Sequence, residues 1–107
     1  MTLDARAHLE SLVGQELRTV RGRPNTVLSV GPRDVMVAAQ RSPGGKPVPI
    51  EWVQAAMDIL ERDGEVTIDV ETVGYRSAFV GAVLATLPGA VVLPTSPPRI
   101  ALGGGDG

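Results

Sequence analysis

The stretch from Ile68 to Leu87, IDVETVGYRSAFVGAVLATL, constrains the fold of this chain more than any other part of it. Asp69 is a favourable N-cap residue, and it predicts a short helix over Val70 to Val73 that stops at Gly74. Apolar residues then recur at helical spacing from about Tyr75 to Leu87. Two helices separated by so short a turn predict a helix-turn-helix.

The segments on either side extend this motif. The segment Pro49 to Arg62 has apolar side chains on one helical face and ends before a glycine, which predicts a further helix. A short strand is expected over Glu65 to Ile68, and β-type runs at Ala90 to Leu93 and Arg99 to Leu102 flank a turn rich in Pro and Ser. Three helices plus a β-wing predict a winged helix-turn-helix over residues 49–102.

The N-terminal half predicts an extension of this core. Thr2 or Asp4 can cap a first helix that runs to about Val13. The Val- and Leu-rich runs between Leu17 and Gln40 flank a Gly-Pro turn, which is typical of a small antiparallel sheet of two or three strands. The segment from Arg41 to Pro49 is expected to be a loop, because Gly and Pro dominate it.

The expected fold class is therefore α+β, a winged helix-turn-helix with an N-terminal helix and a small antiparallel β-extension. Residues 1–102 are expected to form one domain, made of the extension (1–48) and the core (49–102). The Gly-rich tail, residues 103–107, is expected to be disordered.

The composition excludes several kinds of function without identifying one. The 107 residues are 43% apolar and include no cysteine and one histidine, His8, so disulfides, thiolate chemistry and a histidine pair for a metal are excluded. No nucleotide-binding loop or nucleophile elbow is present. We therefore expect neither catalysis nor a cofactor. No apolar run approaches the roughly 20 residues of a membrane span, so no membrane partner is expected and a cytoplasmic location is predicted.

The charges are unevenly distributed along the chain. Between Leu17 and Ile50 there are six basic residues against one acid, a net charge of +5, whereas the segment from Glu51 to Glu71 carries one basic residue against seven acids, a net charge of −6. One part of the surface could therefore meet a polyanion while another repels it.

Two groups of residues are candidate DNA contacts. In a helix-turn-helix the second helix places its first residues near base edges, and the wing contacts the backbone or the minor groove. Here these positions are Tyr75, Arg76 and Ser77 at the helix start and Arg99 at the base of the wing. The segment RTVRGRPN concentrates guanidinium groups, which suit phosphates. The residues predicted to hold phosphates or to add an amide contact are Arg18, Arg21, Arg23, Asn25, Arg33 and Arg41.

Two alternatives remain open at this point. Arg18 and Arg21 could instead pair with acids of the neighbouring helix, such as Glu51 or Asp58, which would neutralise the basic segment internally. The second helix of the motif also has a face of small residues that could pack on a partner helix, so a protein-interaction or dimerisation module is the competing function. The residues of that face are Ser77, Ala78, Gly81, Ala82 and Ala85.

The runs GQELRTVRGRPNTVLSV, RSPGGKPVPIEWVQAAMDIL and GYRSAFVGAVLATLPG lie between Gly14 and Leu102. This region resembles the N-terminal head module of McrA-like, modification-dependent HNH restriction endonucleases of bacteria. The resemblance implies a role in restricting foreign or modified DNA, with double-stranded DNA as the partner and with a nuclease domain fused to the module or associated with it. It also implies that Tyr75, Arg76 and Ser77 contact DNA. With a single histidine, the chain itself contains no HNH nuclease.

Overall fold

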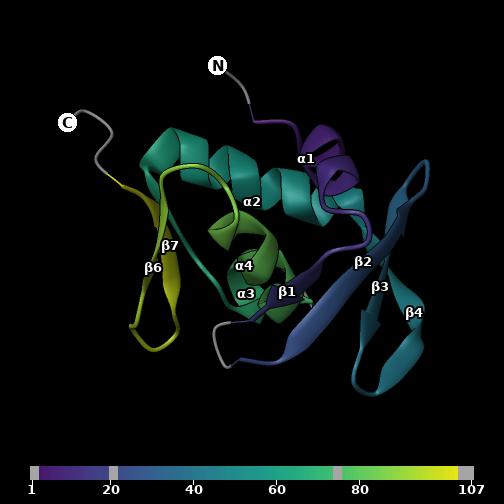
Figure 1. Cartoon of the computed structure of the whole chain (residues 1–107). Coiled ribbons are helices and arrows are strands. Elements are labelled where there is room, and N and C mark those ends of the chain that lie inside the picture. The colour runs from purple at the N-terminus through teal and green to yellow at the C-terminus, as the bar shows by residue number, and fades with distance from the viewer. Residues whose placement is uncertain (1–2, 20–21, 74–75, 104–107) are drawn as a thin grey trace.

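The computed structural model of the chain describes residues 3–19, 22–73 and 76–103. Over these residues the chain forms four helices and seven strands, and the strands belong to two antiparallel sheets (Figure 1). The predicted α+β class is confirmed. In chain order the elements are α1 (Ala5–Ser11), β1 (Glu16–Arg18), β2 (Pro24–Val30), β3 (Asp34–Ala39), β4 (Ser42–Pro49), α2 (Ile50–Asp63), β5 (Glu65–Thr67), α3 (Val70–Val73), α4 (Ser77–Ala85), β6 (Ala90–Leu93) and β7 (Arg99–Leu102).

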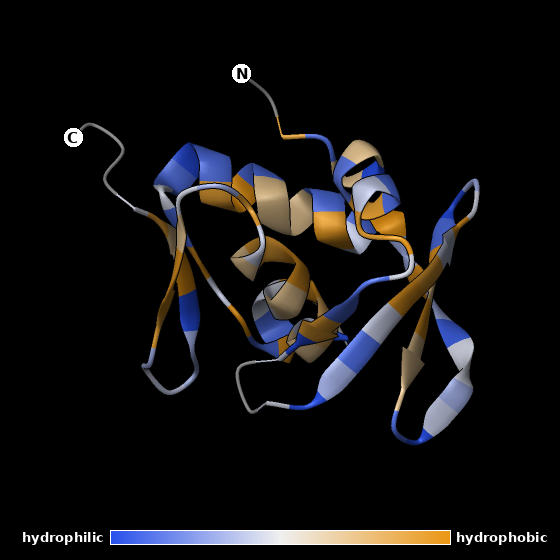
Figure 2. Cartoon of the chain, viewed as in Figure 1, coloured by the Kyte–Doolittle hydropathy of each residue, from blue (hydrophilic) through white to orange (hydrophobic). Residues whose placement is uncertain are grey.

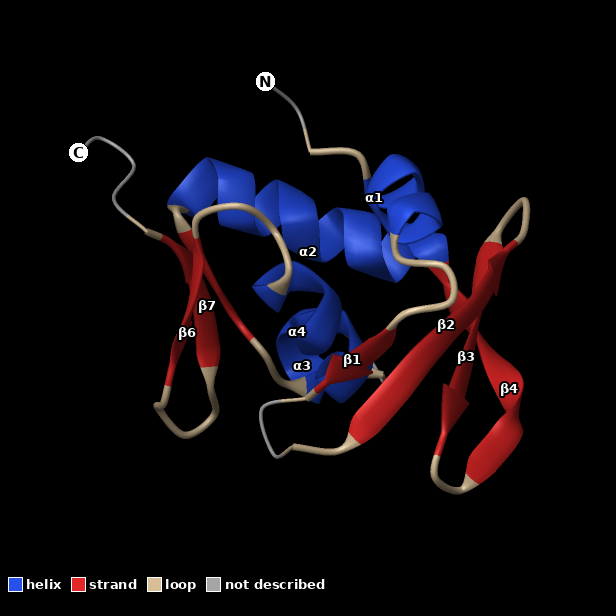
Figure 3. Cartoon of the chain, viewed as in Figure 1, coloured by secondary structure: helices blue, strands red, loops and turns tan. Residues whose placement is uncertain are grey.

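The first four strands form a sheet of order β1-β2-β3-β4, in which each strand pairs with the next one along the chain. Because side chains alternate between the two faces of a strand, one face can be wholly apolar. Val27, Val35, Val37 and Val48 occupy this face and are fully buried. These valine side chains therefore belong to the hydrophobic core that the sheet shares with the helices. The sheet lies on the opposite side of the helices from the second sheet (Figure 3).

The prediction of a loop from Arg41 to Pro49 is wrong for most of that segment. Residues 42–49 form strand β4, which pairs with β3 from Asp34↔Pro49 to Ala39↔Ser42. β4 is the edge strand of its sheet, and proline is tolerated there because one side of the strand needs no backbone donors. Val48 is the strand's one buried apolar residue among those described, so the sequence carries almost no strand pattern.

Helix α2 has the apolar face that the sequence predicts. Val53, Ala56, Met57 and Leu60 are all fully buried. The helix ends at Gly64, whose φ of 82° is left-handed and whose amide donates to the Leu60 carbonyl. The outer face of α2 is hydrophilic and lies at the edge of the molecule (Figure 2).

The chain after α2 runs β5, α3, α4, β6 and β7, and its three strands form a sheet of order β5-β7-β6. The predicted cap of α3 is confirmed, because the Asp69 carboxylate accepts from the Thr72 amide at 2.8 Å. α4 occupies Ser77–Ala85, a shorter span than predicted. Among the described residues, no helix combines the length and the apolar character that crossing a bilayer would require.

A single hydrophobic core joins the two halves of the chain. It includes Leu9 of α1, Val35 of β3, Met57 of α2, Leu84 of α4 and Ile100 of β7, all buried. α4 lies at the centre, between α2, β1 and the ribbon formed by β6 and β7 (Figure 1). The predicted extension is thus packed directly onto the predicted core.

Candidate nucleic-acid interface

A pocket of about 520 Å³ lies where four segments of the chain meet. These segments are the β1–β2 connection, the residue after β5, the first turn of α4 and the β6–β7 turn. We call this hollow the α4 pocket. Its lining residues are Thr19, Arg23, Ile68, Ser77, Ala78, Ser96, Pro97 and Pro98.

The β1–β2 connection holds Arg23 at the pocket through its backbone. The Thr19 amide donates to the Arg23 carbonyl at 3.0 Å, and the Arg23 amide donates to Thr19 Oγ1 at 3.1 Å. Thr19 is only 7% exposed, whereas Arg23 is exposed. A buried anchor therefore positions the backbone of a residue whose guanidinium group faces solvent.

The start of α4 supplies polar backbone groups to the same place. The Arg76 carbonyl accepts the first helical hydrogen bond, from the Val80 amide at 3.0 Å, and no side chain among the described residues caps the helix. The amides of the first helical turn have no partner within the helix, and they carry its partial positive charge. Ser77 is half-buried and Ala78 is exposed, so this turn reaches the surface.

The β6–β7 turn is braced against the rest of the pocket. The Ile68 amide donates to the Pro98 carbonyl at 2.8 Å, and Thr95 Oγ1 donates to the Pro97 carbonyl at 2.8 Å. These bonds place the proline rings beside the first turn of α4. The turn therefore forms one wall of the α4 pocket.

Two of the predicted DNA contacts are paired with acids. Arg18 lies 3.2 Å from a Glu16 carboxylate oxygen on its own strand, and Arg99 lies 2.9 Å from Glu65 on the neighbouring strand. Both pairs are partly exposed, so they contribute little stability. They do reduce the charge that either arginine presents to DNA.

The specific pairing considered for the basic segment is not observed. The acidic partner of Arg18 is Glu16, not Glu51 or Asp58. The Asp58 carboxylate instead accepts from the Gln54 side chain at 3.0 Å. Arg21, the other arginine in that alternative, lies outside the described residues.

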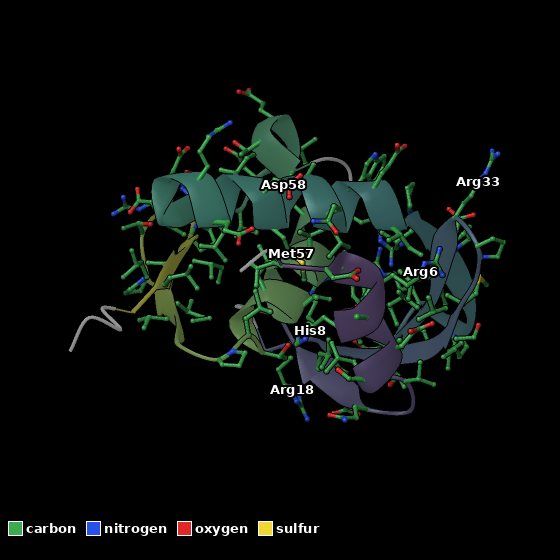
Figure 4. All side chains as sticks on the ribbon, turned by 90° about the horizontal axis from the view of Figure 1, so that it is seen from above. Arg6, His8, Arg18, Arg33, Met57 and Asp58 are labelled. Atoms are coloured by element: carbon green, nitrogen blue, oxygen red, sulfur yellow. The ribbon has the colours of Figure 1, made fainter. Side chains whose placement is uncertain are left out.

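The arginines do not form one field, which corrects the expectation of a single basic face. Arg33 precedes β3 and Arg41 follows it, so the two lie at opposite ends of the same strand. Arg18 and Arg33 project from different sides of the molecule (Figure 4). The β3–β4 and β6–β7 turns point away from α2, whereas the β2–β3 turn with Arg33 lies at the opposite end (Figure 1). Arg23 and Arg41 therefore belong to the end that carries the α4 pocket, and Arg33 does not.

Asn25 is not placed for an amide contact. It was expected in the loop before this strand, but β2 begins at Pro24 and so includes Asn25. The residue is only 7% exposed. Its Nδ2 donates to the Arg23 carbonyl at 3.5 Å. Asn25 thus supports the backbone at Arg23 and has little surface for a ligand.

Of the predicted helix-start contacts, Arg76 and Ser77 are half-buried beside the pocket, and Tyr75 lies outside the described residues.

The body of α4 is not an exposed face. Residues 79–84 are all buried, and a Cβ added at Gly81 would lie 2.9 Å from Ile68 Cγ2. The small residues at Gly81 and Ala82 therefore allow close packing within this chain, and the proposed docking of a partner helix on them is wrong. The same burial leaves the first turn as the part of α4 that can approach a ligand.

His8 lies at the other end of α4. Its Nε2 is 2.7 Å from Thr86 Oγ1, and burial lowers the pKa of the imidazole. Thr86 follows the last residue of α4, whereas the α4 pocket adjoins the first turn. His8 is therefore not part of the α4 pocket.

Sequence reasoning missed several lining residues of the pocket. The sequence gives no functional signal at Thr19 or Ile68, and it indicates Ala78 only as part of the small helix face. It indicates Ser96, Pro97 and Pro98 only as part of the turn of the wing. The run of proline at the wing tip was the one available signal.

Comparison with family models, with curated proteins and with solved structures finds no match to this chain.

Proposed function

We propose that this chain is a non-catalytic DNA-binding module, and that residues 50–102 are a winged helix whose second helix is also contacted by β1 of the N-terminal extension. The order α2, β5, α3, α4, β6 and β7 supports this proposal, as does the β5-β7-β6 arrangement of the second sheet. In that arrangement α3 and α4 are the helix-turn-helix, and the β6–β7 turn is the wing.

The observation that carries the proposal is the α4 pocket. It brings an exposed arginine, the first turn of α4 and the wing together at one end of the molecule. Arginine and unpaired helix-start amides suit phosphate oxygens, and hydroxyl groups can bond to phosphates or base edges. Helix α2, which carries Glu51, Asp58, Glu61 and Asp63, lies away from the turns at this end (Figure 1), so its acids do not oppose a polyanion there.

The mode of binding that we propose differs from a helix laid along the major groove. Because residues 79–84 are buried, only the first turn of α4 can reach DNA, together with the turns beside it. The cations proposed to contact phosphates are the arginines at this end that form no ion pair among the described residues, namely Arg23, Arg41 and Arg76. Three phosphate contacts predict a slope of about −3 for the logarithm of the binding constant against the logarithm of salt concentration.

In its biological setting the module is proposed to recognise DNA, modified or unmodified, for a restriction or defence endonuclease. This part of the proposal rests on the resemblance of Gly14 to Leu102 to the head module of McrA-like endonucleases. The nuclease would act from a fused or associated domain. The small-residue helix face on which the competing dimerisation function was based is buried at Gly81 and Ala82.

A pair of charge reversals tests the proposal. Arg23→Glu should weaken binding to any duplex at least about tenfold, because it replaces a phosphate contact with a repulsion. Arg33→Glu makes the same change at the opposite end of the molecule and should have little effect. Binding is measured by fluorescence anisotropy with unmodified, methylated and phosphorothioated duplexes over a range of salt concentrations. The absence of binding to all three at low salt, or an equal loss in both variants, would contradict the proposal.

A further inference from the structure

The lining of the α4 pocket combines buried residues with exposed polar and charged ones. Ile68 and Thr19 are buried at 6% and 7% exposure, while Arg23 and Ser96 are exposed at the rim. Pro97 and Pro98 add flat ring surfaces to one side. A phosphate alone would use the rim of this pocket and leave its apolar interior empty.

The shape of the pocket also excludes a duplex as its occupant. A volume of about 520 Å³ lies within the range of sites that take one small molecule, roughly 300 to 1,000 Å³. A duplex is read by an element that enters its groove, and the buried body of α4 cannot enter one. The pocket is therefore of a size for one small unit, and the exposed Arg23 offers a cation to an anion beside it.

We infer that the α4 pocket takes one unpaired nucleobase of the bound DNA, with the adjoining phosphate held by Arg23. This inference rests on the proposed function. The base faces would lie against the proline rings and Ala78, and the hydroxyl groups of Ser77 and Ser96 would reach its polar edge. A base that is already unpaired costs less to seat than one extruded from a duplex, so such DNA binds more tightly.

The experiment compares two fluorescein-labelled duplexes that differ by one bulged nucleotide. The wild-type chain should bind the bulged duplex about tenfold more tightly than the fully paired one. Ala78→Leu fills the pocket at an exposed helical position, so it should bring the ratio of the two affinities close to one. Ala55→Leu makes the same substitution at an exposed position of α2 and should leave the preference unchanged. A 2-aminopurine placed at the bulge should change its fluorescence on binding to the wild type and not on binding to Ala78→Leu.

The outcomes separate this inference from the proposed function. Equal wild-type affinity for the two duplexes would overturn the base pocket and leave DNA binding standing. A bulge preference that survives Ala78→Leu would also overturn it, because the base would then sit elsewhere. The absence of binding to either duplex would overturn both the inference and the proposed function.

Discussion

At the scale of single residues, the surroundings of each arginine decide what it can do. Arg18 and Arg99 have carboxylate partners, on Glu16 and Glu65, whereas Arg23 has an exposed side chain on a backbone fixed by Thr19. The Arg99–Glu65 pair depends on the pairing of β7 with β5, whereas Arg18 and Glu16 lie on the same strand. Residue type alone therefore overestimates how many cations are available to a ligand.

His8 is the residue whose environment predicts a pH response. Thr86 Oγ1 donates to the Val83 carbonyl at 2.6 Å, which leaves its lone pairs to accept from the His8 Nε2–H. Partial burial lowers the pKa of His8, and a backbone hydrogen bond with Val83 opposes this effect. The folded state thus takes up a proton at lower pH than the unfolded chain does.

The free energy of unfolding should therefore fall as the pH drops below about 6.5, the ordinary pKa of histidine, and the loss should level off below the folded-state pKa. His8→Gln keeps a polar side chain that cannot become charged, so it should lose this component. Urea unfolding of both proteins at several values between about pH 7.5 and 5 measures the difference. Carboxylates affect both proteins equally, so a stability difference that does not vary with pH would contradict the role of His8.

At the scale of elements, the sequence predicts the elements that have a local signal and misses the one that has none. The apolar spacing of α2, its glycine stop at Gly64 and the Asp69 cap of α3 are local signals, and the structure confirms all three. β4 has no such signal, since its one buried side chain is Val48 and its strand state depends on pairing with β3. Pairing with β3 therefore makes residues 42–49 a strand, although their intrinsic propensity for strand is low.

Val48 offers a test of β4. Val48→Ala should lower the free energy of unfolding by about 1 to 3 kcal/mol, because it leaves a cavity beside the other buried valines of the sheet. Pro47→Ala changes an exposed neighbour on the same strand and should cost less than about 1 kcal/mol. Urea midpoints compare the two variants. Equal costs would show that β4 contributes no more than a loop.

At the scale of the whole molecule, the candidate site could not be derived from the sequence. The sequence indicated Arg23 and Ser77 separately, but the α4 pocket also needs Thr19, Ile68 and the wing turn. These residues come from four segments, and only the packing of the N-terminal extension onto α4 brings them together. Residues 79–84 of α4 are buried, because this helix packs against α2, α3, β1 and the β6–β7 ribbon.

The extension and the core are bound by polar contacts as well as apolar ones. Gln54 of α2 accepts from the Ala5 amide at 2.8 Å and donates to the Leu3 carbonyl at 2.9 Å, which ties the start of α1 to the middle of α2. Leu9 of α1 lies in the same buried cluster as Met57 of α2. A division into two independent units at residue 48 would cut through this cluster.

The chain should therefore unfold in one cooperative step. Trp52, the single tryptophan, reports on α2, and far-ultraviolet circular dichroism reports on all the helices, so the two urea transitions should coincide. Leu9→Ala should lower both midpoints together, at a cost of about 2 to 5 kcal/mol, because the cavity opens in the shared core. Leu28→Ala alters an exposed leucine of the four-stranded sheet and should cost about 1 kcal/mol or less. If Leu9→Ala shifts the dichroism transition while the Trp52 transition stays in place, the extension folds on its own, and the α4 pocket then depends on docking between two units rather than on one fold.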